Sequence, residues 1–296
     1  MKVIKLLFIA MLLCDCSGPK RTIENNSIAI IQRDVKNDSV TVTVTAVKET
    51  SSAPNTIAAK ETKPIEQDNV SNDAKEAYSK KEACPVHNTW DELLKKHVSD
   101  TGNVNYKGIK TDWKTLQDYI VYLGNKLPKD TWAKEGKLAY WINAYNAMTI
   151  DLILRHYPLK SIKDINDPWK QRHWKLGNKW YNLDEIEHQI LRKMDEPRIH
   201  FAIVCASYSC PNLLNEAYIA SNLNEQLTLA TKAFLNDPER NSISKNHLEL
   251  SKIFKWFPED FKKNGGLIDF LNQYSEIEIS EQAKIKYKNY NWALNE

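Results

Sequence analysis

The stretch that decides the fold is GKLAYWINAYNAMTIDLILRHY, residues 136–157, and Pro158 follows it directly. From Leu138 to Ile150 almost every position is apolar, a pattern typical of a helix that is buried on all sides. Proline cannot continue a helix, so Pro158 predicts where this one ends. A helix with no polar face needs other elements packed around it, and we therefore expect the domain to fold about residues 136–157.

Two asparagines, Asn143 and Asn146, interrupt this apolar pattern three residues apart, which places them on one face of the helix. A buried amide without a partner costs about 1–3 kcal/mol. We therefore predict that both are buried and hydrogen-bonded to groups outside their own helix. They could hold a neighbouring loop, or they could face a site and there orient a histidine, bind substrate or bind an oxyanion.

The second informative stretch is HFAIVCASYSCPN, residues 200–212, which holds two of the five cysteines. The apolar run 201–204 predicts a short interior strand, and residues 206–209 predict a loop. Pro211 favours the first position of a helix, which would make Cys210 the N-cap. There the helix dipole favours a thiolate, whereas burial at a strand end raises the pKa of Cys205. Cys210 is therefore predicted to be the more reactive thiol.

A thiol hydrolase also needs a base, a group that orients the base, and oxyanion donors. His188 and His200 are the candidate bases, although alternation along the predicted strand places His200 on the face opposite Cys205. Glu185 lies three residues before His188, on the same predicted helix face, and could orient it. The order Asn, His, Cys is the reverse of papain's, so a papain-like or transglutaminase-like architecture is an analogy only.

Other interpretations of these residues remain open. Both cysteines could pack in the core or form a small disulfide loop in an oxidising compartment. Metal binding by His188, His200 and a cysteine is weakly specified, and the cysteine spacing does not indicate a zinc site. We expect no cofactor. A non-enzymatic binding or assembly module is the competing hypothesis if certain aromatic side chains are exposed. These are Trp169, Trp174, Trp180, Trp256 and Phe257.

The first 84 residues differ in character from the rest. Residues 1–16, MKVIKLLFIAMLLCDC, resemble a bacterial lipoprotein signal with Cys16 as the lipidated residue, although Asp15 stands where a small residue is usual; a plain secretory signal is the alternative. Residues 17–84 are polar and predict a disordered tether, and residues 85–296 predict one globular domain. These predictions place the protein in the cell envelope, attached to the lipid bilayer through Cys16.

The charge balance excludes one class of partner. The chain has 41 basic and 38 acidic residues, a formal net charge of +3, and no basic block. Nucleic acid is therefore not an expected partner. Smaller signals predict further elements: a hairpin at Gly177-Asn178, a helix from Asn182 to Met194, a helix over 223–234, a hairpin at Lys245-Asn246 and a helix start at Pro258. Together these elements predict an α+β fold, with the central helix packed on a small sheet with hairpins.

Four phrases in order carry a resemblance to a known family: LAYWINAYNAMTIDLILRHYP, LDEIEHQILR, RIHFAIVCASYSCPNL and LSKIFKWFPEDF. Over roughly residues 113–274 the chain resembles the domain of unknown function 547 family, which occurs in exported bacterial proteins and in plants. Asn212 stands where the family usually has a second proline after the cysteine. The resemblance implies an exported mixed α/β domain, and it implies no substrate or catalytic set. From the residues themselves we expect a thiol hydrolase or acyltransferase that acts on amide or ester bonds of an envelope peptide, glycan or protein.

Overall fold

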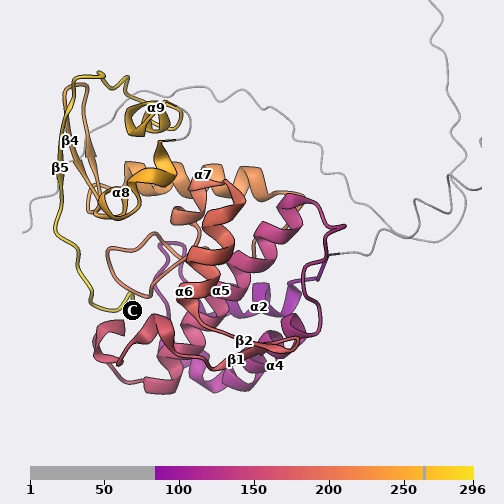
Figure 1. Ribbon diagram of the computed structural model, residues 1–296. Helices are drawn as coiled ribbons and strands as arrows, with labels where there is room; N and C mark the ends of the chain where they lie inside the picture. The colour runs from indigo at the N-terminus through magenta and orange to yellow at the C-terminus, as the bar shows by residue number, and fades with distance from the viewer. Residues whose placement is uncertain (1–83, 263–264) are drawn as a thin grey trace, which may run out of the picture. The chain divides into compact units, whose positions relative to one another are not determined.

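The computed structural model describes residues 84–262 and 265–296, which lie within one compact unit, Asp68–Glu296 (Figure 1). The predicted signal sequence, Cys16 and nearly all of the predicted tether lie outside the described residues. Among the residues that are described, we find no helix with the length and apolar character that crossing a membrane requires.

Helix α5, Lys134–His156, is the centre of the fold, as residues 136–157 predict. Its side chains are buried without interruption from Leu138 to Leu154. Helices α4 and α7 pack against it, and α2 packs on α4 (Figure 1). The helices around α5 are α2 (Asn88–His97), α3 (Tyr106–Ile109), α4 (Trp113–Gly124) and α7 (Leu223–Asn236). Together they enclose the larger of two hydrophobic cores.

The predicted hairpin is confirmed as strands β1 (Trp174–Leu176) and β2 (Lys179–Tyr181), which pair antiparallel. Gly177 in the turn has a φ of 58°, a conformation that glycine adopts without strain. The helix predicted after Asn182 also forms, but it is irregular. Helix α6 (Leu183–Glu185) continues as a π-helical segment, Ile186–Ile190, and ends in a 3₁₀ turn, Leu191–Met194.

A second core lies under the C-terminal elements and is built largely from phenylalanine side chains. Its sheet has the order β3-β4-β5, with β3 and β4 antiparallel and β4 and β5 parallel. The elements are β3 (Ser242–Ile243), β4 (His247–Leu250), α8 (Ile253–Trp256), a 3₁₀ turn Pro258–Phe261, α9 (Leu267–Asn272) and β5 (Lys284–Tyr287). The α+β class is thereby confirmed, although the two sheets are separate and small and α5 packs mainly against helical elements and not on a sheet as expected.

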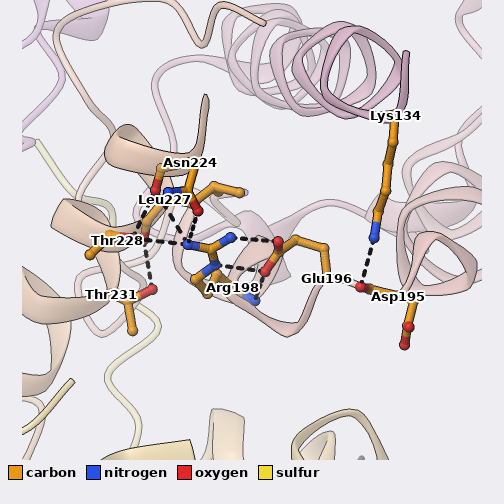
Figure 2. A network of polar contacts seen from close by, with 8 residues as sticks. All are labelled: Lys134, Asp195, Glu196, Arg198, Asn224, Leu227, Thr228 and Thr231. Carbon is orange, nitrogen blue, oxygen red and sulfur yellow. Dashed lines mark hydrogen bonds and ion pairs between the residues drawn. The ribbon is translucent and has the colours of Figure 1, made fainter. Parts of the chain in front are cut away.

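The predicted strand over 201–204 is wrong. A 3₁₀ helix, Pro197–Phe201, occupies its start, and a turn follows. Arg198 fixes this 3₁₀ helix to α7, as Figure 2 shows. Its guanidinium donates to both oxygens of Glu196, at 2.7 Å each, and to Thr228 Oγ1 at 2.9 Å. Proline at the start and the docking of Arg198 therefore override the β-propensity of the apolar run.

Candidate active site

A cavity of about 740 Å³ lies where the two cores meet, and its lining comes from both. Cys205 and Cys210 contribute to its wall, as do Glu187, His188 and His200. The structure therefore brings together both cysteines and both histidines that the sequence singles out. Glu185, Asn143 and Asn146 are not part of the lining.

The cysteine loop, residues 205–210, is held by its own backbone and not by a helix. The Cys205 N–H donates to Cys210 Sγ at 2.9 Å, and the Cys210 N–H donates to the Ser207 carbonyl at 2.9 Å. Ala206 between them has a φ of 56°, in the left-handed region. Residues 211–214 have no helical structure, so the prediction that Cys210 caps a helix is wrong.

The Cys205 sulfur lies among three donors. Its Sγ is 2.7 Å from Cys210 Sγ, 2.9 Å from Ser207 Oγ and 3.2 Å from Tyr290 Oη. Burial by itself raises the pKa of the Cys205 thiol, but hydrogen bonds from these three groups outweigh burial and lower the pKa to about 7. Burial and the neighbouring Cys205 raise the pKa of Cys210 well above its usual range. The pKa of Cys205 is therefore lower than that of Cys210, which is the opposite of the predicted order.

Tyr290 reaches the site because a C-terminal segment, residues 290–295, lies against the cysteine loop. The Tyr208 N–H donates to the Ala293 carbonyl at 2.7 Å, and the Ser209 N–H donates to the Asn291 carbonyl at 3.2 Å. Tyr290 Oη also lies 3.1 Å from Ser207 Oγ, whose single hydroxyl hydrogen points either to Tyr290 or to the Cys205 sulfur. The same segment thus supports the loop backbone and supplies one donor to the Cys205 sulfur.

His200 is buried and belongs to a chain of charged groups. Its Nε2 lies 2.7 Å from Asp260 Oδ2, and its ring stacks on Phe257 at 4.2 Å between centroids. Arg192 donates to both oxygens of Asp260, at 2.6 and 3.1 Å. Burial lowers the pKa of His200, with Asp260 acting against it, so the neutral ring donates its Nε2–H to the carboxylate. Burial opposes ionisation of Asp260, but His200 and Arg192 outweigh it and hold the pKa of that carboxyl well below its usual range.

The predicted pairing of Glu185 with His188 is wrong. Glu185 forms ion pairs with Arg172 and Lys179. The π-helical segment begins between the two residues, so the ordinary helical spacing that would align them does not hold. His188 Nδ1 instead lies 3.0 Å from an Arg192 nitrogen.

Glu187, the neighbour of His188 in sequence, is the carboxyl group that faces the cavity from this segment. It is buried and accepts a hydrogen bond from Tyr145 Oη at 3.1 Å. Burial raises the pKa of the Glu187 carboxyl. The Glu187 carboxyl is therefore closer to its protonated form than a carboxyl in water.

The prediction for the two asparagines of α5 is confirmed. Asn143 donates to the Tyr218 carbonyl at 2.7 Å and accepts from the Tyr218 N–H at 3.0 Å. Asn146 donates to the Ala202 carbonyl at 2.9 Å and accepts from the Val204 N–H at 3.0 Å. Both amides therefore hold backbone segments, and neither side chain lines the cavity. Asn146 instead fixes the turn that leads into Cys205.

Aromatic side chains form one wall of the cavity. Trp256 stacks on Trp292 at 5.7 Å between centroids, and Trp169 meets Trp292 edge-on at 5.9 Å. Of the five aromatic residues that the sequence offers for a binding surface, Trp169, Trp256 and Phe257 line the cavity. Trp174 is buried in the core, and the exposed Trp180 belongs to the β1–β2 hairpin and does not line it.

The metal hypothesis finds no support in residues 84–262 and 265–296, where no group of three or more histidine, cysteine, aspartate or glutamate side chains is arranged to hold an ion. Both cysteines of the loop are free thiols. The alternative that they form a structural disulfide is therefore not what the structure contains.

Fold and site together define a compact α+β domain with a pair of thiols at the wall of an aromatic cavity. Residues 129–235 match the model of a family described as "Protein of unknown function, DUF547", which supports the resemblance over that segment. The match contains the cysteine loop and both candidate histidines, and it ends before Asp260 and Tyr290. No curated protein and no solved structure matches the chain.

Several residues of the site are not among the sequence candidates, and four of them contact Cys205 or His200 or place a carboxyl group at the cavity: Glu187, Ser207, Asp260 and Tyr290. Two of them could have been named from the sequence: Glu187 lies in LDEIEHQILR and Asp260 in LSKIFKWFPEDF. Each is an acidic residue in a phrase that carries the resemblance. Ser207 could have been named as a polar residue between the two cysteines. Tyr290 had no local signal, since only the path of residues 290–295 brings it to Cys205.

Proposed function

We propose that this domain is a thiol-dependent hydrolase or acyltransferase with Cys205 as its nucleophile. The observation that carries the proposal is the environment of the Cys205 sulfur, which lies within hydrogen-bond distance of the Cys210 thiol and the Ser207 and Tyr290 hydroxyls at the wall of a cavity of about 740 Å³. A thiolate is the reactive form of cysteine, and these groups stabilise it without a histidine beside it.

The reaction has two steps. The Cys205 thiolate attacks the carbonyl carbon of an amide or ester, a carbon–sulfur bond forms, and the amine or alcohol leaves with a proton from an acid in the cavity. Water or an acceptor nucleophile then attacks the thioester and releases Cys205. We assign the proton transfers to His200, which Asp260 holds as the neutral Nε2–H tautomer, and to Glu187, whose pKa burial raises.

The carboxylate–histidine pair supports this assignment of roles. Asp260 accepts from His200 Nε2, so the ring nitrogen that can take a proton is Nδ1. Among the described residues, neither histidine of the cavity has a nitrogen within hydrogen-bond distance of a cysteine sulfur. His200 Nδ1 therefore takes the proton of the attacking water, and the protonated Glu187 carboxyl gives a proton to the leaving group. Cys205 is activated by the groups around its own sulfur.

The test is acylation of the full chain by an activated ester such as 4-nitrophenyl acetate, followed by peptide mapping. We expect an acetyl group on Cys205 and none after Cys205→Ser. Cys84→Ser is the matched control, because Cys84 is also a partly buried free thiol but lies outside the cavity. His200→Gln should leave acylation intact and slow the loss of the acetyl group. Equal acylation of Cys84 and Cys205, or none on Cys205, would overturn the proposal.

The aromatic wall favours a second candidate, a binding module without catalysis. Trp169, Trp256 and Trp292 meet at one side of the cavity, and the Lys163 ammonium lies 4.6 Å from the centroid of Trp292. Such a wall suits a glycan or peptide ligand. The protein can be titrated with envelope glycans and peptides while its tryptophan fluorescence is measured, and this experiment separates the enzyme from the binding module. Binding that is unchanged in Cys205→Ser, without acylation of the wild-type protein, favours the module.

We further propose that the domain works in the cell envelope, attached through a lipid on Cys16 to the bilayer, with a peptide, glycan or protein substrate there. The signal-like residues 1–16 support this. Cys16→Ala should move the expressed protein from the membrane fraction to the soluble fraction. An unchanged distribution would remove the anchor from the proposal.

A further inference from the structure

Cys210 has no covalent role in the proposed acyl transfer, yet it is the nearest side chain to the nucleophile. Its Sγ lies 2.7 Å from Cys205 Sγ, and both thiols are free. The sequence offers this closeness only as the alternative of a small disulfide loop. The contact arises from the conformation of the loop, with Ala206 in the left-handed region and the Cys205 N–H directed at Cys210 Sγ.

We propose that Cys205 and Cys210 form a redox-active dithiol, which reduces a disulfide bond of a substrate that enters the cavity and becomes a disulfide itself. This activity goes beyond acyl transfer, although it rests on the same reactive Cys205. The shared chemistry of the substrate is an accessible disulfide, whether it belongs to a small thiol compound or to a peptide.

The loop is built to keep the two sulfurs together. Arg240 donates to the carbonyls of Tyr208 and Cys210, at 2.8 Å each, and also to Asn212 Oδ1 at 3.2 Å. On its other side the loop backbone pairs with the C-terminal segment, residues 290–295. A bond between the sulfurs requires a separation of about 2.05 Å, so the two sulfurs need to approach by less than 1 Å from their present 2.7 Å.

The exchange balances in two steps. The Cys205 thiolate attacks one sulfur of the substrate disulfide, a mixed disulfide forms, and the other substrate sulfur leaves as a thiolate and takes up a proton. Cys210 then gives up its proton and attacks Cys205 Sγ in the mixed disulfide, and the second substrate sulfur leaves as a thiolate that takes up this proton. Two electrons pass from the protein dithiol to the substrate, and the protein retains a Cys205–Cys210 disulfide.

The two thiols differ in the way that this sequence of steps requires. Both cysteines line the cavity, but Cys205 is partly exposed whereas Cys210 is buried. The pKa of Cys205 is lowered by its donors and that of Cys210 is raised by burial. Cys205 is therefore the attacking thiol and Cys210 the resolving thiol, which keeps its proton until the mixed disulfide has formed beside it.

The test exposes the reduced full chain to glutathione disulfide in one arm and to a disulfide-bonded peptide in the other, with peptide mapping after acid quench. In the wild-type protein we expect a Cys205–Cys210 disulfide and only a transient adduct. Cys210→Ser and Cys210→Ala should each accumulate the adduct on Cys205, on the order of tenfold above wild type. Cys205→Ser should form neither product, and Cys84→Ser should behave as wild type.

The outcomes separate this proposal from the proposed acyl transfer. Reaction in one arm alone identifies the substrate as a small disulfide or a peptide disulfide, and both results support a dithiol. A stable mixed disulfide on Cys205 in the wild-type protein, equal to that in Cys210→Ser, overturns the dithiol. If Cys205 takes an acetyl group from the ester but never pairs with Cys210, the dithiol fails and the acyl transfer stands. An unreactive Cys205 in both assays overturns both.

Discussion

Replacing Tyr290 with phenylalanine isolates one donor of the Cys205 sulfur. The ring of Tyr290 packs on Trp256 and Trp292, at 4.8 and 4.6 Å between centroids, and phenylalanine keeps these contacts. Only the hydroxyl is lost, and with it the 3.2 Å contact to Cys205 Sγ and the 3.1 Å contact to Ser207 Oγ. The substitution therefore tests the electrostatic role of Tyr290 with little change in packing.

The size of the effect follows from the hydrogen bond that is lost. A hydrogen bond to a charged group contributes about 1.5–3 kcal/mol, and about 1.4 kcal/mol corresponds to one pH unit of pKa. The Tyr290 contact is the longest of the three, and Ser207 and Cys210 remain, so we take the lower end of this range. From a value of about 7, the pKa of Cys205 should rise by roughly one pH unit.

The assay is the rate of alkylation of Cys205 by iodoacetamide across pH, followed by peptide mass spectrometry. The midpoint of the rate profile reports the pKa of the thiol. Tyr287→Phe is the matched control, because Tyr287 is an exposed tyrosine on β5 that does not line the cavity. A midpoint in Tyr290→Phe equal to that of wild type would show that the hydroxyl does not stabilise the thiolate. So would an equal rise in Tyr287→Phe.

Two further predictions concern stability. Asn146→Leu leaves the Ala202 carbonyl and the Val204 N–H without their partner, and should lower the free energy of unfolding in urea by about 2–4 kcal/mol; Asn222→Leu, at an exposed position, should change it by about 0.5 kcal/mol or less. Equal effects would contradict the role of Asn146. Asp260→Asn tests the low pKa of the Asp260 carboxyl. Because its pKa is lower in the folded than in the unfolded state, the ionised carboxylate stabilises the fold above the unfolded pKa near 3.9. This stabilisation is lost as pH falls through the folded pKa. The variant should be less stable at neutral pH and approach wild type in acid, and a constant difference across pH would contradict this.

The helices were the most predictable part of the fold. The apolar run of α5 and the stripe of α7 bury large areas, and burial dominates local propensity over segments of that length. The β1–β2 hairpin was predictable because Gly177 in its turn satisfies a backbone requirement that few residues meet. In each case a strong local signal agrees with the tertiary structure.

The site was less predictable, because its geometry depends on contacts between distant segments. The apolar run after His200 has the composition of a strand, yet Asn146 binds the Ala202 carbonyl and the Val204 N–H, the groups that a neighbouring strand would need. The π-helical segment changed the neighbours of His188 without any sequence signal. One of the three groups that lower the pKa of Cys205 is Tyr290, which is 85 residues from Cys205.

The C-terminal segment, residues 290–295, has a consequence for the order in which the molecule assembles. Tyr290 meets Cys205 across 85 residues, and Asn295 accepts from Tyr106 Oη across 189 residues. Contacts at such separations close long loops and tend to form late in folding. A chain that has formed only α5 and α7 therefore lacks the Tyr290 hydroxyl beside Cys205 Sγ and the pairing of the cysteine loop with residues 290–295. The surroundings of the Cys205 sulfur are thus completed only when these long-range contacts form.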